Sequence, residues 1–271
     1  MLSALELAII AILACLAWWG STGLILLVLA RPEKTHKRAM LVGVMLATAA
    51  IFVVWQTAVS TTVTAIVASF LATLAIWGAI EMAFLMGYVI GPVRETCPPD
   101  LTTWNRFKAS WHALSHHELA LAGALTLLFF ATRGAPNTMA FDSFALLWLM
   151  RLSTKLNIFL GVRNASEELL GPRTRHLASY FRKATMNPLF PVSITATTLV
   201  TILLASEAVT STNAASAAGA TLLATFAALA VVEHCFLMLP LQQSALWPWP
   251  TKSETPTPAR SVEITSRAMK T

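Results

Sequence analysis

The chain contains apolar runs of about 20 residues or more, and these limit its fold more than any other feature. A helix needs about 20 apolar residues to cross a hydrocarbon core about 30 Å thick. We therefore expect an all-α, polytopic membrane protein, a bundle of seven transmembrane helices. The seven stretches that reach or approach this length span residues 5–29, 40–59, 62–90, 114–132, 139–162, 189–208 and 216–240.

The composition supports this fold class and argues against a soluble enzyme. Only 12% of the 271 residues are charged, against about 25% in soluble domains. The cysteines Cys15, Cys97 and Cys235 are far apart, which indicates neither a disulfide framework nor a zinc site. The sequence has no P-loop, no HExxH motif and no paired nucleophile and base. We therefore predict that the protein is not an enzyme, and we assign no catalytic residue.

The positive charges are concentrated in alternate loops. The loops after the first, third and fifth apolar runs and the C-terminal tail hold clusters of lysine and arginine, whereas the other loops hold only Arg133. Cytoplasmic loops of membrane proteins carry the excess of lysine and arginine. We therefore expect a periplasmic N-terminus and a cytoplasmic C-terminus, with the net charge of +6 reflecting topology rather than a nucleic-acid partner.

We expect two parts in the chain, a seven-helix transmembrane domain over residues 1–245 and a disordered cytoplasmic tail over residues 246–271. The tail is rich in proline, serine, threonine and lysine. Trp247 and Trp249 at its start are expected in an aromatic belt at the membrane interface. In the first span, residues 18–23 read WWGSTG, which predicts either close helix packing or a seat for a flat ligand.

Ionisable and amide side chains lie inside four of the expected spans, at similar distances from their cytoplasmic ends. With a rise of about 1.5 Å per residue, they fall in the cytoplasmic half of the membrane. A charge left unpaired in hydrocarbon is costly, so these side chains should approach one another. We predict one buried polar cluster, formed by Glu81, His117, Glu118, Arg151, Lys155, Asn157, Glu233 and His234.

Three roles for this cluster stay open. Its glutamates can pair with Arg151 or Lys155 and fix the register of the helices without any further function. An imidazole can instead ligate the magnesium of a chlorin, or a transition metal of unknown identity. The third role is proton or ion transport, although the sequence lacks the repeat symmetry of many transporters. The candidate pigment or metal ligands are His117, His234, His112 and His116.

The segment from residue 163 to residue 188 is the candidate for contact with a partner. It combines adjacent glutamates, five basic residues and adjacent aromatic residues, a mixture that can bind protein surfaces or anionic lipid. The alternative is that its charges only set the topology and that it forms an amphipathic helix at the interface. The residues predicted to contact a partner are Asn164, Glu167, Glu168, His176, Tyr180 and Phe181.

Beyond these physical inferences, the sequence resembles the PuhE family, photosynthetic complex assembly protein 2, of anoxygenic phototrophic bacteria. The resemblance covers nearly the whole chain before the tail, and the combination of stretches is specific although no single one would suffice. The stretches that carry it are WWGSTG at 18–23, WGAIEMAFLMGY at 77–88, HE at 117–118, TKLNIFLGV at 154–162, MNPLFPVS at 186–193 and EHCFLMLP at 233–240.

This resemblance implies an assembly factor for the photosynthetic reaction-centre and light-harvesting complex, which handles or regulates the supply of bacteriochlorophyll. The alternatives are a stoichiometric structural or pigment-binding subunit of that complex, and a membrane enzyme or subunit of bacteriochlorophyll synthesis. The implied partners are photosynthetic subunits or pigment-synthesis proteins, in the lipid bilayer of the bacterial inner (intracytoplasmic) membrane. The resemblance establishes no cofactor and leaves bacteriochlorophyll or a related chlorin as the candidate. If a chlorin binds, we expect His117 or His234 as its ligand, because a neutral imidazole offers a nitrogen lone pair.

Overall fold

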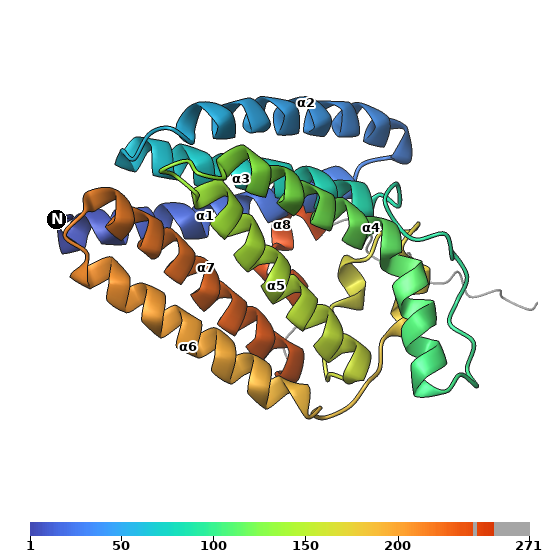
Figure 1. The fold of residues 1–271 in the computed structure, drawn as a ribbon. Coiled ribbons are helices and arrows are strands. Elements are labelled where there is room, and N and C mark those ends of the chain that lie inside the picture. Colours follow the sequence, from blue (N-terminus) through green and yellow to red (C-terminus); the bar gives the residue numbers. More distant parts are fainter. Residues whose placement is uncertain (241–242, 252–271) are drawn as a thin grey trace, which may run out of the picture.

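The computed structural model describes residues 1–240 and 243–251, and every named element within them is a helix (Figure 1). The all-helical prediction is therefore confirmed. Six helices are long and apolar enough to cross a membrane, which agrees with a multi-pass membrane protein. The six are α1 (Ala4–Leu29), α2 (Glu33–Thr57), α3 (Val63–Leu85), α4 (Thr103–Thr132), α6 (Leu189–Thr210) and α7 (Ala214–Met238).

The fifth expected span is present as a helix, α5 (Met139–Leu160), but it is not among the six helices that are long and apolar enough to cross a membrane. It is 22 residues long and carries Asp142, Arg151, Lys155 and Asn157. In Figure 1 it runs between α4 and α7, and it also contacts α3 and α6. The expected count of seven spans and their orientation therefore stay predictions.

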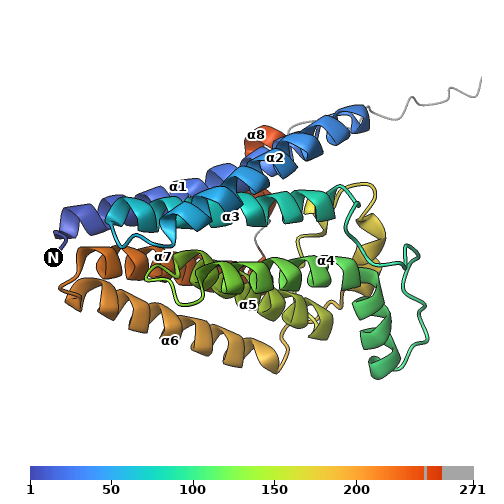
Figure 2. The same cartoon turned by 45° about the horizontal axis from the view of Figure 1, so that its top comes forward.

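The helices form two layers, seen most clearly in Figure 2. One layer contains α1, α2 and α3, and the other contains α4 to α7. In their most apolar windows, 61% of the residues of α7 and 50% of those of α3 are buried, against 11% for α6. The rings of Phe70 and Phe226 meet between the layers at a centroid distance of 4.6 Å. The core therefore lies between α3 and α7, and α2 and α6 present apolar outer faces suited to lipid.

Polar caps and glycines set where the helices begin and end. Thr62, Thr102 and Asn213 accept hydrogen bonds from first-turn amides of α3, α4 and α7. After α3 and α5 the chain turns at Gly87, with φ of 75°, and Gly161, with φ of 126°. Glycine adopts these angles without steric cost. α3 therefore ends before the predicted span over residues 62–90 does.

Residues 161–188 cover one end of the bundle, which we call the loop end. They contain only two short 3-10 helices, η1 (Glu167–Leu169) and η2 (Arg175–Tyr180). The amides of Arg163 and Asn164 donate to the Leu237 carbonyl at 3.1 and 3.0 Å. The Asn187 amide group donates to the Gly161 carbonyl at 2.8 Å. These bonds hold the segment against the ends of α5 and α7.

The residues after α7 return to α1, where η3 (Gln243–Leu246) and α8 (Pro248–Thr251) lie. The Trp247 indole N–H donates to the Trp19 carbonyl at 3.0 Å, and the Trp19 indole N–H donates to the Leu246 carbonyl at 3.0 Å. A Cβ atom at Gly23 would come within 2.9 Å of the Trp247 ring, so only glycine leaves room for it. Trp247 is 1% exposed and Trp249 is 44% exposed, and their expected position at the membrane interface stays a prediction. The rest of the predicted tail, residues 252–271, lies outside the described residues.

Candidate functional site

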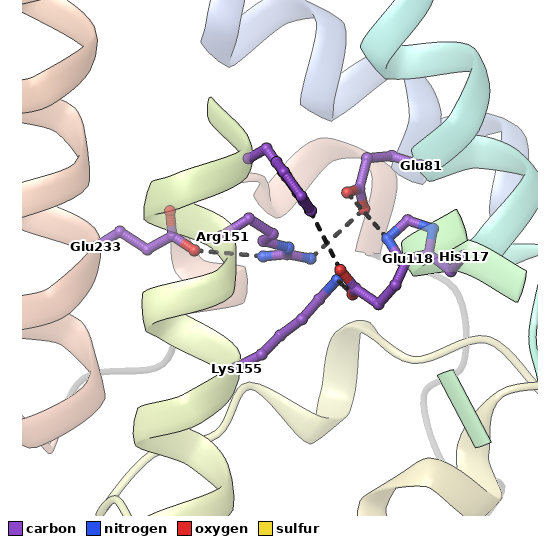
Figure 3. A network of polar contacts seen from close by, with 7 residues as sticks. Glu81, His117, Glu118, Arg151, Lys155 and Glu233 are labelled. Atoms are coloured by element: carbon purple, nitrogen blue, oxygen red, sulfur yellow. Dashed lines mark hydrogen bonds and ion pairs between the residues drawn. The ribbon is translucent and has the colours of Figure 1, made fainter. Parts of the chain in front are cut away.

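Six of the eight residues of the predicted cluster meet between the two layers (Figure 3). They come from four helices, so their contacts join segments that are far apart in the sequence. Glu81 comes from α3, His117 and Glu118 from α4, Arg151 and Lys155 from α5, and Glu233 from α7. The arrangement supports the prediction that these charges share one site, which we call the buried charge cluster.

Arg151 lies at the centre of the buried charge cluster and contacts two carboxylates. Its guanidinium is 3.5 Å from Glu81 and 3.3 Å from Glu233, so α5 is joined to both α3 and α7. A second ion pair joins α5 to α4: the Lys155 ammonium contacts the Glu118 carboxylate, which also accepts a hydrogen bond of 3.2 Å from the Trp148 indole. Trp148, Arg151 and Lys155 are spaced three and four residues apart, on one helix face. That spacing is the signal that would have added Trp148 to the prediction.

His117 is fully buried in the same cluster. Its ring lies against Phe84, with ring centroids 4.3 Å apart. Its Nε2 is 3.6 Å from the nearer Glu81 oxygen, which is beyond hydrogen-bond distance. Within the described part of the chain, neither ring nitrogen has a hydrogen-bond partner. His117 is therefore held by packing and sits beside the charges without a direct bond to them.

Asn157 and His234 form a separate polar group with residues of α5 and α6. The His234 Nδ1 lies 2.8 Å from the Ala230 carbonyl, and its Nε2 lies 2.9 Å from the Ser153 hydroxyl. The Asn157 amide group donates to the Ser193 hydroxyl at 2.9 Å. The Ser153 hydroxyl also donates to the Ser193 hydroxyl at 3.0 Å, which joins His234 and Asn157 in one group. Each ring nitrogen of His234 therefore lies within hydrogen-bond distance of an oxygen of the protein.

The four histidines proposed as ligands do not converge. His112 and His116 are exposed on α4, whereas His117 and His234 are buried in the two different groups described above. Among the described residues, no three His, Cys, Asp or Glu side chains are grouped as a metal site would require. The arrangement offers single imidazoles rather than a multidentate site.

The predicted docking residues divide between packed and accessible positions. Tyr180 is buried, its hydroxyl donates to the Glu95 carbonyl at 3.2 Å, and burial raises the pKa of this phenol. Burial lowers the pKa of His176, which is partly covered. Phe181 packs near Val162 and Leu237, and Asn164 lies at the same bundle end. The accessible part of the segment carries Glu168 and the ion pair of Glu167 with Lys183, 3.1 Å long.

Two cavities adjoin the buried charge cluster. One, of about 180 Å³, lies between α1, α3, α5 and α7 and is lined by Trp18, Trp77 and Trp247. The second, of about 150 Å³, lies between α4, α5, α7 and the loop end. Arg151 and Glu233 line both cavities. This ion pair therefore forms part of the wall between them.

The sequence is similar to other proteins over the whole helical part of the chain. A family model described as "Protein of unknown function (DUF3623)" matches residues 4–257. A Rhodobacter capsulatus protein described as "Uncharacterized 30.4 kDa protein in puhA 5'region" is 36% identical over 245 residues, covering 89% of each chain. No solved structure matches the chain.

Proposed function

The chain belongs to the DUF3623 family, and from this membership we propose that it is an assembly factor for photosynthetic reaction-centre and light-harvesting complexes. The observation that carries the proposal is the location of its relative, in the 5′ region of puhA within a photosynthesis gene cluster. The resemblance to the PuhE family leads to the same pathway. The proposed location is the bacterial inner, intracytoplasmic membrane.

The buried charge cluster supports a role as a scaffold rather than as an enzyme. Arg151 pairs with Glu81 and Glu233, and Lys155 pairs with Glu118, so that α5 is joined to α3, α7 and α4. Buried ion pairs of this kind specify one arrangement of helices, because breaking one leaves an uncompensated charge in a medium of low dielectric. A fixed arrangement is what a docking surface for membrane partners requires.

A bound chlorin does not fit the interior sites proposed from the sequence. His117 is fully buried against Phe84, and both nitrogens of His234 have contacts within the protein. The adjoining cavities measure about 180 and 150 Å³, and a cavity of about 150 Å³ holds one benzene ring. A chlorin macrocycle is several times larger. We therefore derive no pigment step through these histidines, and the proposed control of pigment supply rests on partners.

We propose seven spans with a periplasmic N-terminus, in which α5 joins the six apolar helices as an additional span. Ion pairs to neighbouring helices allow the charged side chains of α5 to lie in the membrane. Reporter fusions after Ala30 and after Arg133 should report the cytoplasm and the periplasm, respectively. If both fusions report the same side, the proposed topology is wrong.

The proposed docking surface is the accessible part of residues 163–188, and a photoreactive amino acid at Glu168 tests it. We expect this variant to crosslink to a reaction-centre, light-harvesting or pigment-synthesis protein while complexes are being assembled. The same substitution at the exposed Glu207, at the other end of α6, is the control and should give no such product.

The copy number of this protein in mature photosynthetic complexes distinguishes an assembly factor from a structural subunit. An assembly factor should be present far below one copy per purified complex, although the Glu168 crosslink forms in growing membranes. One copy in every mature complex would favour the structural subunit, and crosslinks to lipid alone would remove the docking surface.

A further inference from the structure

The larger cavity beside the buried charge cluster is lined by aromatic and aliphatic side chains, and the proposed assembly role gives this cavity no function. Three tryptophans, Trp18, Trp77 and Trp247, line it together with leucine and isoleucine side chains. Its volume of about 180 Å³ exceeds the roughly 150 Å³ of an engineered cavity that binds benzene. A small organic group therefore fits inside it without a change in the backbone.

Carboxylates provide most of the charge on the cavity wall. Glu81 and Glu233 line it with Arg151, and the hydroxyl residues Ser21 and Thr22 lie on the α1 side. The Glu81 side chain is 10% exposed, and its contacts with Arg151 and His117 are 3.5 and 3.6 Å long. Charge-assisted hydrogen bonds are normally about 2.7–2.9 Å long. Glu81 Oε1 has no hydrogen-bond partner among the described residues.

The charges of the cluster do not balance. Glu81, Glu118 and Glu233 provide three carboxylates, whereas Arg151 and Lys155 provide two cations. With a neutral imidazole at His117, one negative charge is left over. In an environment of low dielectric such a surplus is unfavourable. One additional positive charge in this cavity would therefore be stabilised.

We propose that this cavity binds an organic ammonium group, either the head of an amphiphile or a small free cation. Tryptophan rings attract quaternary ammonium ions through the cation–π interaction, and methyl groups on the ion suit the apolar walls. The Glu81 carboxylate provides the counter-charge. Trp247, hydrogen-bonded to the Trp19 carbonyl, covers the bound group on the side of the C-terminal segment. This binding is independent of the assembly role and can fail without affecting it.

Equilibrium dialysis of radiolabelled choline against the full-length protein in an uncharged detergent tests the proposal. We expect saturable binding, and we expect dimethylbutanol, the uncharged isostere of choline, to compete at least about tenfold more weakly. Glu81→Gln should weaken choline binding about tenfold or more, because it removes the charge without changing the shape. Glu207→Gln, an exposed carboxylate outside the cavity, should leave binding unchanged.

A cavity-filling variant keeps the test decisive if Glu81→Gln does not fold. Thr22→Leu adds bulk to the cavity wall and breaks no ion pair, so it should abolish choline binding while the helical circular dichroism is kept. Choline binding in nanodiscs of phosphatidylglycerol and of phosphatidylcholine then distinguishes the source. Weaker binding in phosphatidylcholine identifies a lipid headgroup, and equal binding identifies a free cation. No choline binding in phosphatidylglycerol, or equal competition by dimethylbutanol, would overturn the proposal.

Discussion

Replacing Lys155 with methionine is expected to destabilise the protein by about 3 kcal/mol, close to the cost of breaking a buried ion pair. Glu118 is 6% exposed, and without Lys155 its carboxylate would keep, among the described residues, only the Trp148 indole as a hydrogen-bond donor. Methionine has nearly the same length, so the loss would come from the missing charge rather than from packing. Unfolding of the purified protein in mixed micelles by an anionic detergent measures the difference.

Two further variants separate this effect from a general intolerance of substitution. The double variant Glu118→Gln with Lys155→Met should recover most of the lost stability, because it removes both charges. Arg173→Gln breaks the exposed pair with Glu33 and should cost about 1 kcal/mol or less. If the Lys155 and Arg173 variants are destabilised equally, the cluster does not stabilise the bundle.

Gly91→Ala is expected to cost a similar amount, about 3 kcal/mol, for a steric reason. The Gly91 amide donates to the Ala113 carbonyl at 2.7 Å, where the segment after α3 crosses α4. A Cβ atom at this position would lie 1.6 Å from the His112 carbonyl oxygen and 2.6 Å from the Ala113 carbonyl carbon. These are backbone atoms of a helix, so they cannot move aside as a flexible side chain would.

Gly123, on the helix that Gly91 contacts, provides the matched control. A Cβ atom at Gly123, in α4, meets no atom within 4 Å. Gly123→Ala should therefore be neutral or up to about 1 kcal/mol stabilising, as alanine favours the helix. We expect Gly91→Ala to increase cleavage of residues 86–102 by a protease, while Gly123→Ala does not. Equal unfolding curves for the two variants would contradict the close approach at Gly91.

The apolar runs identified where helices cross the membrane but not how far the helices extend. α2 begins at Glu33, seven residues before the run at 40–59, and α4 begins at Thr103, well before the run at 114–132. In Figure 2 the first turns of α4 are inclined to the rest of the helix. Hydropathy measures the part of a helix in hydrocarbon, whereas caps and turns decide its ends.

The buried charge cluster was predictable because depth along each helix can be counted at about 1.5 Å per residue. The direction in which each side chain points around its helix was not used. This direction explains why Asn157 and His234 lie outside the cluster. Asn157 is two residues from Lys155 and so points to a different side of α5, where it meets Ser193 of α6. His234 follows Glu233 and likewise lies on another face of α7, beside Ser153.

The docking of Trp247 on α1 could not be predicted, because the two segments are 228 residues apart in the sequence. Composition marked residues 246–271 as a tail, and no local pattern indicates that its first residues return to Trp19. The fit depends on the space beside Gly23, which only the packed structure reveals. The larger cavity was unpredictable for the same reason, since four helices and this segment form it.

We propose that the protein promotes the assembly of photosynthetic complexes without catalysing a step of pigment synthesis. Deletion of its gene in the native host tests this role, when assembled complexes and free pigment precursors are measured in the same membranes. We expect assembled complexes to fall several-fold, subunit synthesis to continue and no single precursor to accumulate. Accumulation of one bacteriochlorophyll precursor, or wild-type amounts of assembled complexes, would contradict the claim.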